Sequence, residues 1–194
     1  MKAVLISIQP KWCELIASGK KTVEVRKTKP KLETPFKVYI YCSKPKGKND
    51  MGLCLDDGEV GYVFKQNYKA ASRFKMPILS GKVIGEFVCD RLTFIDAYYD
   101  TNGNRHLCNT AFIGNTRLTD DELFDYLYGK YGRKHGGWAW RISNLVIYDE
   151  PKELSEFHSY NCGVKFENGY PMPTHEIKRP PQSWCYVEES EVKK

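Results

Sequence analysis

The sequence has no long hydrophobic run. No apolar stretch approaches the roughly 20 residues that a membrane-spanning helix requires, so we expect no transmembrane helix and no membrane partner. The first ten residues carry one lysine and a short apolar stretch, but they lack the small-residue cleavage site of a secretory signal peptide. Their pattern predicts a first β-strand over residues 3–8.

Regular cysteine spacing is also missing. There is no Cys-x-x-Cys pair, and His106-x-Cys108 stands alone, so the spacing predicts neither a metal site nor a disulfide framework. Cys42 and Cys89 lie inside apolar runs, which is typical of buried, reduced thiols in a cytoplasmic protein. We therefore predict a cytoplasmic protein without metal, cofactor or disulfide. The seven cysteines are Cys13, Cys42, Cys54, Cys89, Cys108, Cys162 and Cys185.

Acidic residues are scarce in the first quarter of the chain. Between Lys2 and Lys48 only Glu14, Glu24 and Glu33 balance a much larger number of lysines and arginines, and the whole chain has a net charge of +6 with neutral histidines. Such a basic segment is compatible with a nucleic-acid partner, but a solvated surface has the same composition. Charge alone leaves both interpretations open.

Short alternating apolar segments predict a mainly β fold with a few helices, in the α+β class. They suit a small closed or half-open barrel around one core. Gly85 lies inside the fourth predicted strand, which indicates a bulge or a bend there. The predicted strands span residues 3–8, 22–26, 36–42, 81–92, 137–148 (as one strand or two) and 183–187.

Two helices carry clear start and stop signals. Pro10 suits the first position of a helix over residues 10–18, and Gly19 suits the residue just past its end. Thr119-x-x-Glu122 has the pattern of a capping box that opens a second helix. A long irregular loop is expected over residues 100–117.

The segment Gly19–Arg26 reads as G-x-K-x-x-E-x-R, with Lys21, Glu24 and Arg26 as its charged members. Preceded by Ser7-Ile8-Gln9-Pro10 and set between a strand, a capped helix and a second strand, it resembles the signature of the ASCH-domain family, a branch of the PUA-like superfold. The resemblance covers about two-thirds of the chain. It implies a single domain over residues 1–194 with a PUA-like pseudo-β-barrel and insertions at about 44–80 and 95–135.

The same resemblance implies a cleft beside the first helix and an RNA or nucleotide partner. Some members of the family are enzymes on RNA or on modified nucleosides. A few small relatives deacetylate acetylcytidine with the motif lysine, a threonine and a distant glutamate. In this sequence Glu24 stands in the place of that threonine, and Thr22 lies one strand repeat earlier.

The residues by themselves suggest three roles for the motif. Lys21 follows a helix end, and Glu24 and Arg26 lie on the polar face of one strand, so we expect the three side chains to converge. A carboxylate that orients exposed cations suits phosphate or base binding. A Lys–Glu pair could also carry general acid–base catalysis, and a structural ion pair that closes one end of the barrel is a further interpretation.

Further candidates surround the motif. Gln9, Lys11 and Trp12 lie beside it at the start of the first helix, and Ser43 with Lys44 follows a strand end, where a phosphate contact would fit. Trp12 is suited to core packing or to base stacking, and the same alternatives hold for Trp138 and Trp140 on one strand face.

The sequence thus predicts an RNA-binding or modified-nucleotide-binding protein with a basic cleft. The ligand-binding residues would be Gln9, Lys11, Trp12, Lys21, Glu24, Arg26, Ser43 and Lys44. The alternative is a ribonuclease or a nucleoside amidohydrolase of the same fold, with Lys21 and Glu24 as catalytic proton-transfer groups. A further alternative is a protein-interaction module whose insertions contact a partner.

Overall fold

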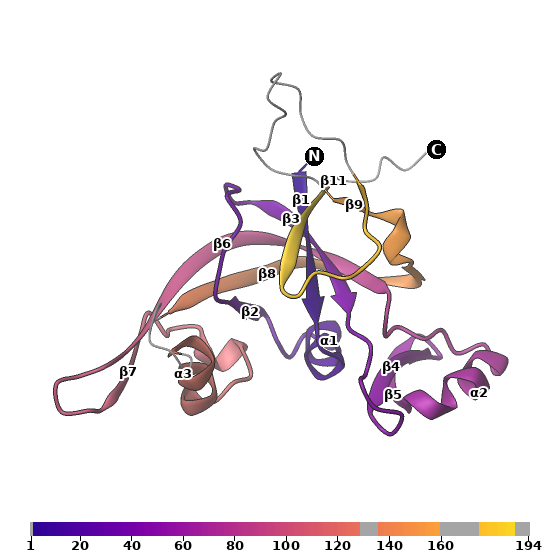
Figure 1. Ribbon diagram of the computed structural model, residues 1–194, viewed down its shortest axis with the longest axis horizontal. Helices are drawn as coiled ribbons and strands as arrows, with labels where there is room; N and C mark the ends of the chain where they lie inside the picture. The colour runs from indigo at the N-terminus through magenta and orange to yellow at the C-terminus, as the bar shows by residue number, and fades with distance from the viewer. Residues whose placement is uncertain (1, 129–135, 160–174, 189–194) are drawn as a thin grey trace, which may run out of the picture.

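One strongly curved sheet dominates the computed structural model, which describes residues 2–128, 136–159 and 175–188 (Figure 1). The strands follow the order β10-β9-β11-β1-β3-β6-β8-β2, and a further strand, β7, pairs with one end of β6. The predicted mainly β, α+β fold is confirmed. The bounds are β1 (Lys2–Ile8), β2 (Val23–Arg26), β3 (Phe36–Cys42), β6 (Val83–Tyr99), β7 (Arg105–Cys108), β8 (Gly137–Lys152), β9 (His158–Ser159), β10 (His175–Glu176) and β11 (Trp184–Glu188).

Of the two expected forms, a closed or a half-open barrel, the closed one is excluded. In the described part of the chain, β2 pairs only with β8 and β10 pairs only with β9, so the two ends of the sheet do not join. The reason lies in β1, whose two edges already hydrogen-bond to β11 and β3 and leave no free edge for β2. The curvature brings β2 close to β1, and side chains occupy the gap between them.

The pairing of β1 with β3 is parallel, whereas the other strand pairs of the described sheet are antiparallel. Its register sets Ser7 beside Tyr41 and Ile8 beside Cys42. Because parallel strands end at the same edge of a sheet, the residues after Ile8 and after Cys42 enter one region. This edge is where the candidate site lies.

Helix α1 (Pro10–Ala17) begins at Pro10 as predicted and ends one residue before the predicted end at residue 18. Pro10 occupies its first turn, and Gly19 has a φ of 70°, the left-handed conformation that ends helices and that glycine adopts without strain. Cys13 and Ile16 are fully buried, and Trp12 packs against the same core. The helix therefore lies firmly against the concave face of the sheet.

Strands β6 and β8 continue past the predicted ends, to Tyr99 and Lys152, and they arch across the molecule (Figure 1). Their register shifts at Gly85, which confirms the predicted bulge. Strand β6 continues after Leu92 to Tyr99. Its last four residues, from Asp96 to Tyr99, pair with β7 at Arg105–Cys108. The expectation of one irregular loop over 100–117 is therefore wrong in part, because this hairpin extends the sheet.

Two segments flank α1 on opposite sides (Figure 1). Residues 51–73 form a separate hairpin of β4 (Met51–Asp56) and β5 (Glu59–Phe64), followed by η1 (Lys65–Asn67) and α2 (Tyr68–Arg73). On the other side lie η2 (Ile113–Asn115) and α3 (Asp120–Tyr128), and η3 (Leu154–Glu156) follows β8. The capping box of α3 is confirmed, because Glu122 N donates to Thr119 Oγ1 at 3.2 Å and Thr119 N donates to Glu122 Oε2 at 2.9 Å. That 44–80 and 95–135 are insertions into a single domain remains a prediction.

Neither a membrane helix nor a metal cluster is found within residues 2–128, 136–159 and 175–188. No helix there has the length and apolar character needed to cross a bilayer. No group of three His, Cys, Asp or Glu side chains is placed to hold a metal ion. The expected absence of a cofactor remains a prediction.

The cysteines lead to a labelling prediction. The six described cysteines are free thiols, and Cys162 lies outside the described residues. Burial raises the pKa of Cys89 to about 12 and that of Cys185 to about 11, whereas Cys108 is exposed. Because the thiolate is the reactive form, we expect iodoacetamide at a pH of about 8 to modify Cys108 long before Cys89 in the native protein. Peptide mass mapping after timed quenching measures both rates, and equal rates would contradict the burial.

A second arm of that experiment tests the redox state. Unfolding without reductant should make all seven thiols available for modification, Cys162 included. A thiol that reacts only after reduction would reveal a disulfide and would argue against the predicted cytoplasmic location.

Candidate functional site

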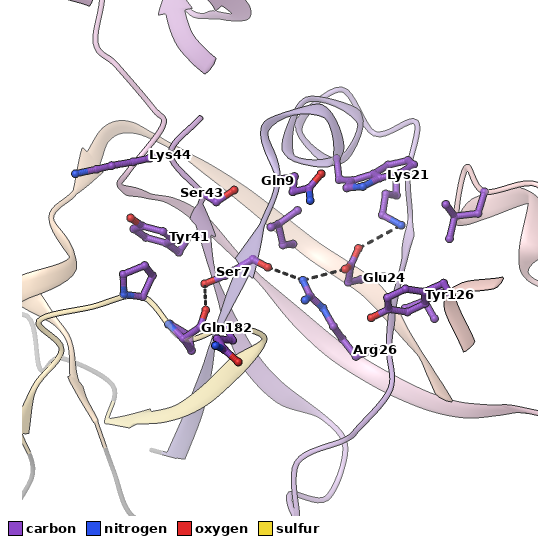
Figure 2. A pocket seen from close by; sticks show the side chains of 16 residues that line it. Ser7, Gln9, Lys21, Glu24, Arg26, Tyr41, Ser43, Lys44, Tyr126 and Gln182 are labelled. Carbon is purple, nitrogen blue, oxygen red and sulfur yellow. Dashed lines mark hydrogen bonds and ion pairs between the residues drawn. The ribbon is translucent and has the colours of Figure 1, made fainter. Parts of the chain in front are cut away.

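A cavity of about 680 Å³ lies where β1 and β3 end (Figure 2). Its lining comes from segments far apart in the sequence: the end of β1, the start of α1, β2 and the residues before it, the end of β3, α3 and the residues before it, and residues 180–182. The parallel register of β1 and β3 accounts for two of these segments, and the curvature of the sheet brings in β2. A volume of this size suits one small ligand.

The motif side chains converge on one wall of this cavity. Lys21 Nζ lies 3.2 Å from Glu24 Oε2, and Arg26 Nη2 lies 3.1 Å from Glu24 Oε1. The exposed fractions of the three side chains are 3% for Lys21, 9% for Glu24 and 11% for Arg26. One carboxylate thus holds two cations, which leaves this ion triad with one net positive charge in a largely buried setting.

Lys21 was expected to be an exposed cation, and this expectation is wrong. Its ammonium also donates to the backbone carbonyls of Val23 at 2.7 Å and Thr116 at 2.9 Å. With Glu24, these acceptors match the three protons of an ammonium group. Residues 115–116 cover Lys21, and a hydrogen bond from Thr22 N to the carbonyl of Asn115 at 3.1 Å holds this segment in place. This segment is about 95 residues away in the sequence, so local spacing could not reveal the burial.

Arg26 bridges the gap in the sheet. Its Nη2 donates to the carbonyl of Ser7 at 2.7 Å, which links β2 to the end of β1 without a backbone ladder (Figure 2). Its buried Nε has no hydrogen-bond partner within the described part of the chain. The motif arginine therefore stabilises the curvature and also contributes to the pocket wall.

The opposite end of the pocket is formed by the end of β3. Tyr41, Ser43 and Lys44 line it, and Figure 2 shows Lys44 pointing away from Glu24. The stem of Lys44 lies across Gly81, where an added Cβ would collide with Lys44 Cε. Burial raises the pKa of the Tyr41 hydroxyl, with Cys42 and Glu153 adding to the effect, so this hydroxyl remains a donor at neutral pH.

Aromatic side chains flank the ion triad. Trp12 from α1 and Tyr126 from α3 both line the pocket, and Lys21 Nζ lies 5.3 Å from the centroid of the Trp12 ring. Lys11 does not line the pocket, although its Nζ lies 4.7 Å from the same centroid. The side chains of Gln9 and Gln182 complete the polar part of the lining.

Seven of the eight predicted ligand-binding residues thus lie together at this pocket, and Lys11 lies next to it. Trp140 is excluded from a stacking role because it is fully buried against Phe36, with ring centroids 5.7 Å apart. Trp138 packs with Phe94 outside the pocket lining. Sequence reasoning missed Leu118, Tyr126 and Gln182, which reach the pocket only through tertiary contacts.

Comparisons with known proteins agree with this fold. Residues 6–101, which include the motif, match the model of the ASCH domain. A crystal structure of a serine-to-alanine mutant of an ASCH protein from Zymomonas mobilis is similar with a TM-score of 0.52 and 16% identity, over 96% of this chain and 89% of that one. The ASCH structure from the same organism gives a TM-score of 0.48 and 16% identity, over 96% and 88%. No curated protein sequence matches this chain. With the motif Gly19–Arg26 inside the matched segment, the chain belongs to the ASCH-domain family.

Proposed function

We propose that the pocket binds a nucleobase, presented by RNA or by a modified nucleotide. The observation that carries this proposal is the combination of the aromatic rings of Trp12 and Tyr126 with uncommitted amide side chains at Gln9 and Gln182. Within the described residues, neither amide has a hydrogen-bond partner. Unstacked bases are recognised in this way, by stacking on aromatic rings and by hydrogen bonds to their edges.

The size and the charge of the site support the same ligand. A cavity of about 680 Å³ accommodates a single base or nucleoside and is too small for a double helix. The ion triad adds one net positive charge beside it. The RNA partner implied by the resemblance to the ASCH family agrees with this charge.

The contacts of Lys21 and Glu24 support binding over catalysis by these two groups. A general acid or base must exchange a proton with the reacting atoms. Lys21 donates to three protein acceptors, and Glu24 holds two cations, so both side chains are occupied by other protein groups. We therefore assign the triad the role of shaping the pocket and setting its charge.

Replacing the aromatic wall tests this function. We expect Tyr126→Ala and Trp12→Ala each to weaken the binding of a fluorescent single-stranded RNA by about tenfold, because base stacking contributes about 1–3 kcal/mol per base. Fluorescence anisotropy measures the Kd, and thermal melts verify that each variant is folded. A panel of modified nucleosides, followed for binding and for turnover, identifies the preferred ligand and tests the enzymatic alternative.

Tyr98→Ala is the matched control. Tyr98 is exposed to 39%, nearly the same as Tyr126 at 38%, but it lies on the β6–β7 hairpin and stacks on His106. Its removal should leave the Kd unchanged. Equal losses for Tyr98→Ala and Tyr126→Ala, or unchanged affinity in both pocket variants, would overturn the proposal.

A further inference from the structure

The two ends of the pocket differ in how their cations are compensated. Lys21 and Arg26 share the carboxylate of Glu24, so one of their two positive charges is balanced inside the protein and both groups are engaged in ion pairs. Lys44 lines the other end and has no carboxylate or other hydrogen-bond partner among the described residues. The exposed ammonium of Lys44 is therefore available for direct contact with a negatively charged group of a ligand.

The position of Lys44 is set by the fold. After β3 ends, Ser43 N donates to the carbonyl of Ile8 at 2.8 Å, and Gly81 N donates to the carbonyl of Cys42 at 2.7 Å. Gly81 has a φ of 94° and no side chain, which leaves its surface open for the stem of Lys44. The lysine is thus supported along its length, whereas its ammonium stays uncommitted.

The end of the pocket that Lys44 lines also carries two hydroxyl groups. Tyr41 and Ser43 line the same end of the pocket (Figure 2), and neither hydroxyl has a partner in the described part of the chain. A lysine with neighbouring hydroxyl donors is a common phosphate-binding set, because the ammonium supplies charge and the hydroxyls supply directed hydrogen bonds.

We propose that Tyr41, Ser43 and Lys44 bind the phosphate of a nucleotide whose base occupies the Trp12–Tyr126 end of the pocket. The proposal rests on the proposed function and narrows it, because the ligand becomes a phosphorylated nucleotide and not a free nucleoside. The base end selects by stacking, and the phosphate end supplies electrostatic attraction.

Calorimetric titration of nucleosides and of their 5′- and 3′-monophosphates tests whether the pocket has separate subsites for the base and the phosphate. We expect a monophosphate to bind about tenfold or more tightly than its nucleoside in wild-type protein at low salt. The difference should shrink as salt rises, since salt screens an exposed lysine. Lys44→Ala should weaken the binding of the monophosphate to the level of its nucleoside. Lys44→Arg should keep the tighter binding of the monophosphate. Tyr41→Phe and Ser43→Ala should each reduce the advantage in part.

Lys46→Ala is the matched control, because Lys46 is exposed in the same loop and does not line the pocket. If Lys46→Ala weakened monophosphate binding as much as Lys44→Ala, the effect would come from the overall charge of the protein, and the proposed subsite would be overturned. A dinucleotide with one internal phosphodiester shows whether the phosphate of a strand serves as well as a terminal one.

The outcomes separate the two proposals. Equal affinity for nucleoside and monophosphate overturns the phosphate subsite and leaves the base pocket standing. Lys44-dependent binding of inorganic phosphate and monophosphate alike, insensitive to Tyr126→Ala, overturns the base pocket and supports the subsite. Failure of every nucleoside, nucleotide and phosphate probe to bind overturns both.

Discussion

Glu24→Gln is expected to lower the free energy of unfolding by about 3–5 kcal/mol, the cost of removing one partner from a buried ion network. Glu24 is the only carboxylate bound to Lys21 and Arg26 in the described part of the chain, and all three side chains are largely buried. Without its charge, two cations face each other in a poorly solvated wall. Urea unfolding followed by tryptophan fluorescence measures the change, and a fall in Tm of roughly 10 °C should accompany it.

Asp90→Asn provides the comparison. Asp90 forms a bidentate pair with Arg141 on the outer surface, where the exposed fractions of the two side chains are 25% and 48%. Exposed pairs contribute about 0–1 kcal/mol, so this variant should be nearly neutral. A Glu24→Gln protein within about 1 kcal/mol of wild type would mean that the triad does not stabilise the curved sheet. A second variant, with Lys21→Met and Glu24→Leu together, should recover part of the loss because it leaves Arg26 as the one remaining charge of the network.

Gly85→Ala is expected to destabilise the protein by about 3 kcal/mol, near the upper end of the usual range for overpacking. A Cβ at this position would collide with the carbonyl oxygen of Val146 and would lie 3.1 Å from Cα of Ile147, both in the facing backbone of β8. A flexible side chain could move away, but a hydrogen-bonded strand cannot without breaking its register. Equilibrium unfolding in denaturant measures this change in the free energy of unfolding.

The control for that variant is Gly61→Ala in β5. The nearest atom to its Cβ would be Cys54 Sγ at 3.9 Å, an ordinary contact distance. We expect a change of less than about 0.5 kcal/mol there. If the two alanine variants were equally stable, the close approach of β6 to β8 at Gly85 would not be required by the fold.

Local patterns determined much of this protein in advance. Alternation predicted the main strands, Pro10 and Gly19 marked the limits of α1, and Thr119 with Glu122 marked the start of α3. Each of these signals depends on backbone preferences or on hydrogen bonds within a few residues, so the sequence contains all the information that they need. The resemblance of Gly19–Arg26 to the ASCH signature likewise required only neighbouring residues.

The extent of β6 and β8 could not be read in this way. Their outer halves carry polar and aromatic residues without clean alternation, because they pair with each other and with β7 beyond the core. Strand pairing between distant segments stabilised these regions, and no local pattern records it.

The sequence by itself determined the mainly β class, the α1 boundaries and the identity of the charged motif. Only the tertiary structure decided that the sheet stays open, that Arg26 bridges the gap to Ser7, and that Lys21 is buried beneath residues 115–116. The physical reason is that exposure and charge compensation depend on which distant segments fold over a side chain. Lys44, which has the same charge as Lys21, remains uncommitted because in the described structure no such segment covers it.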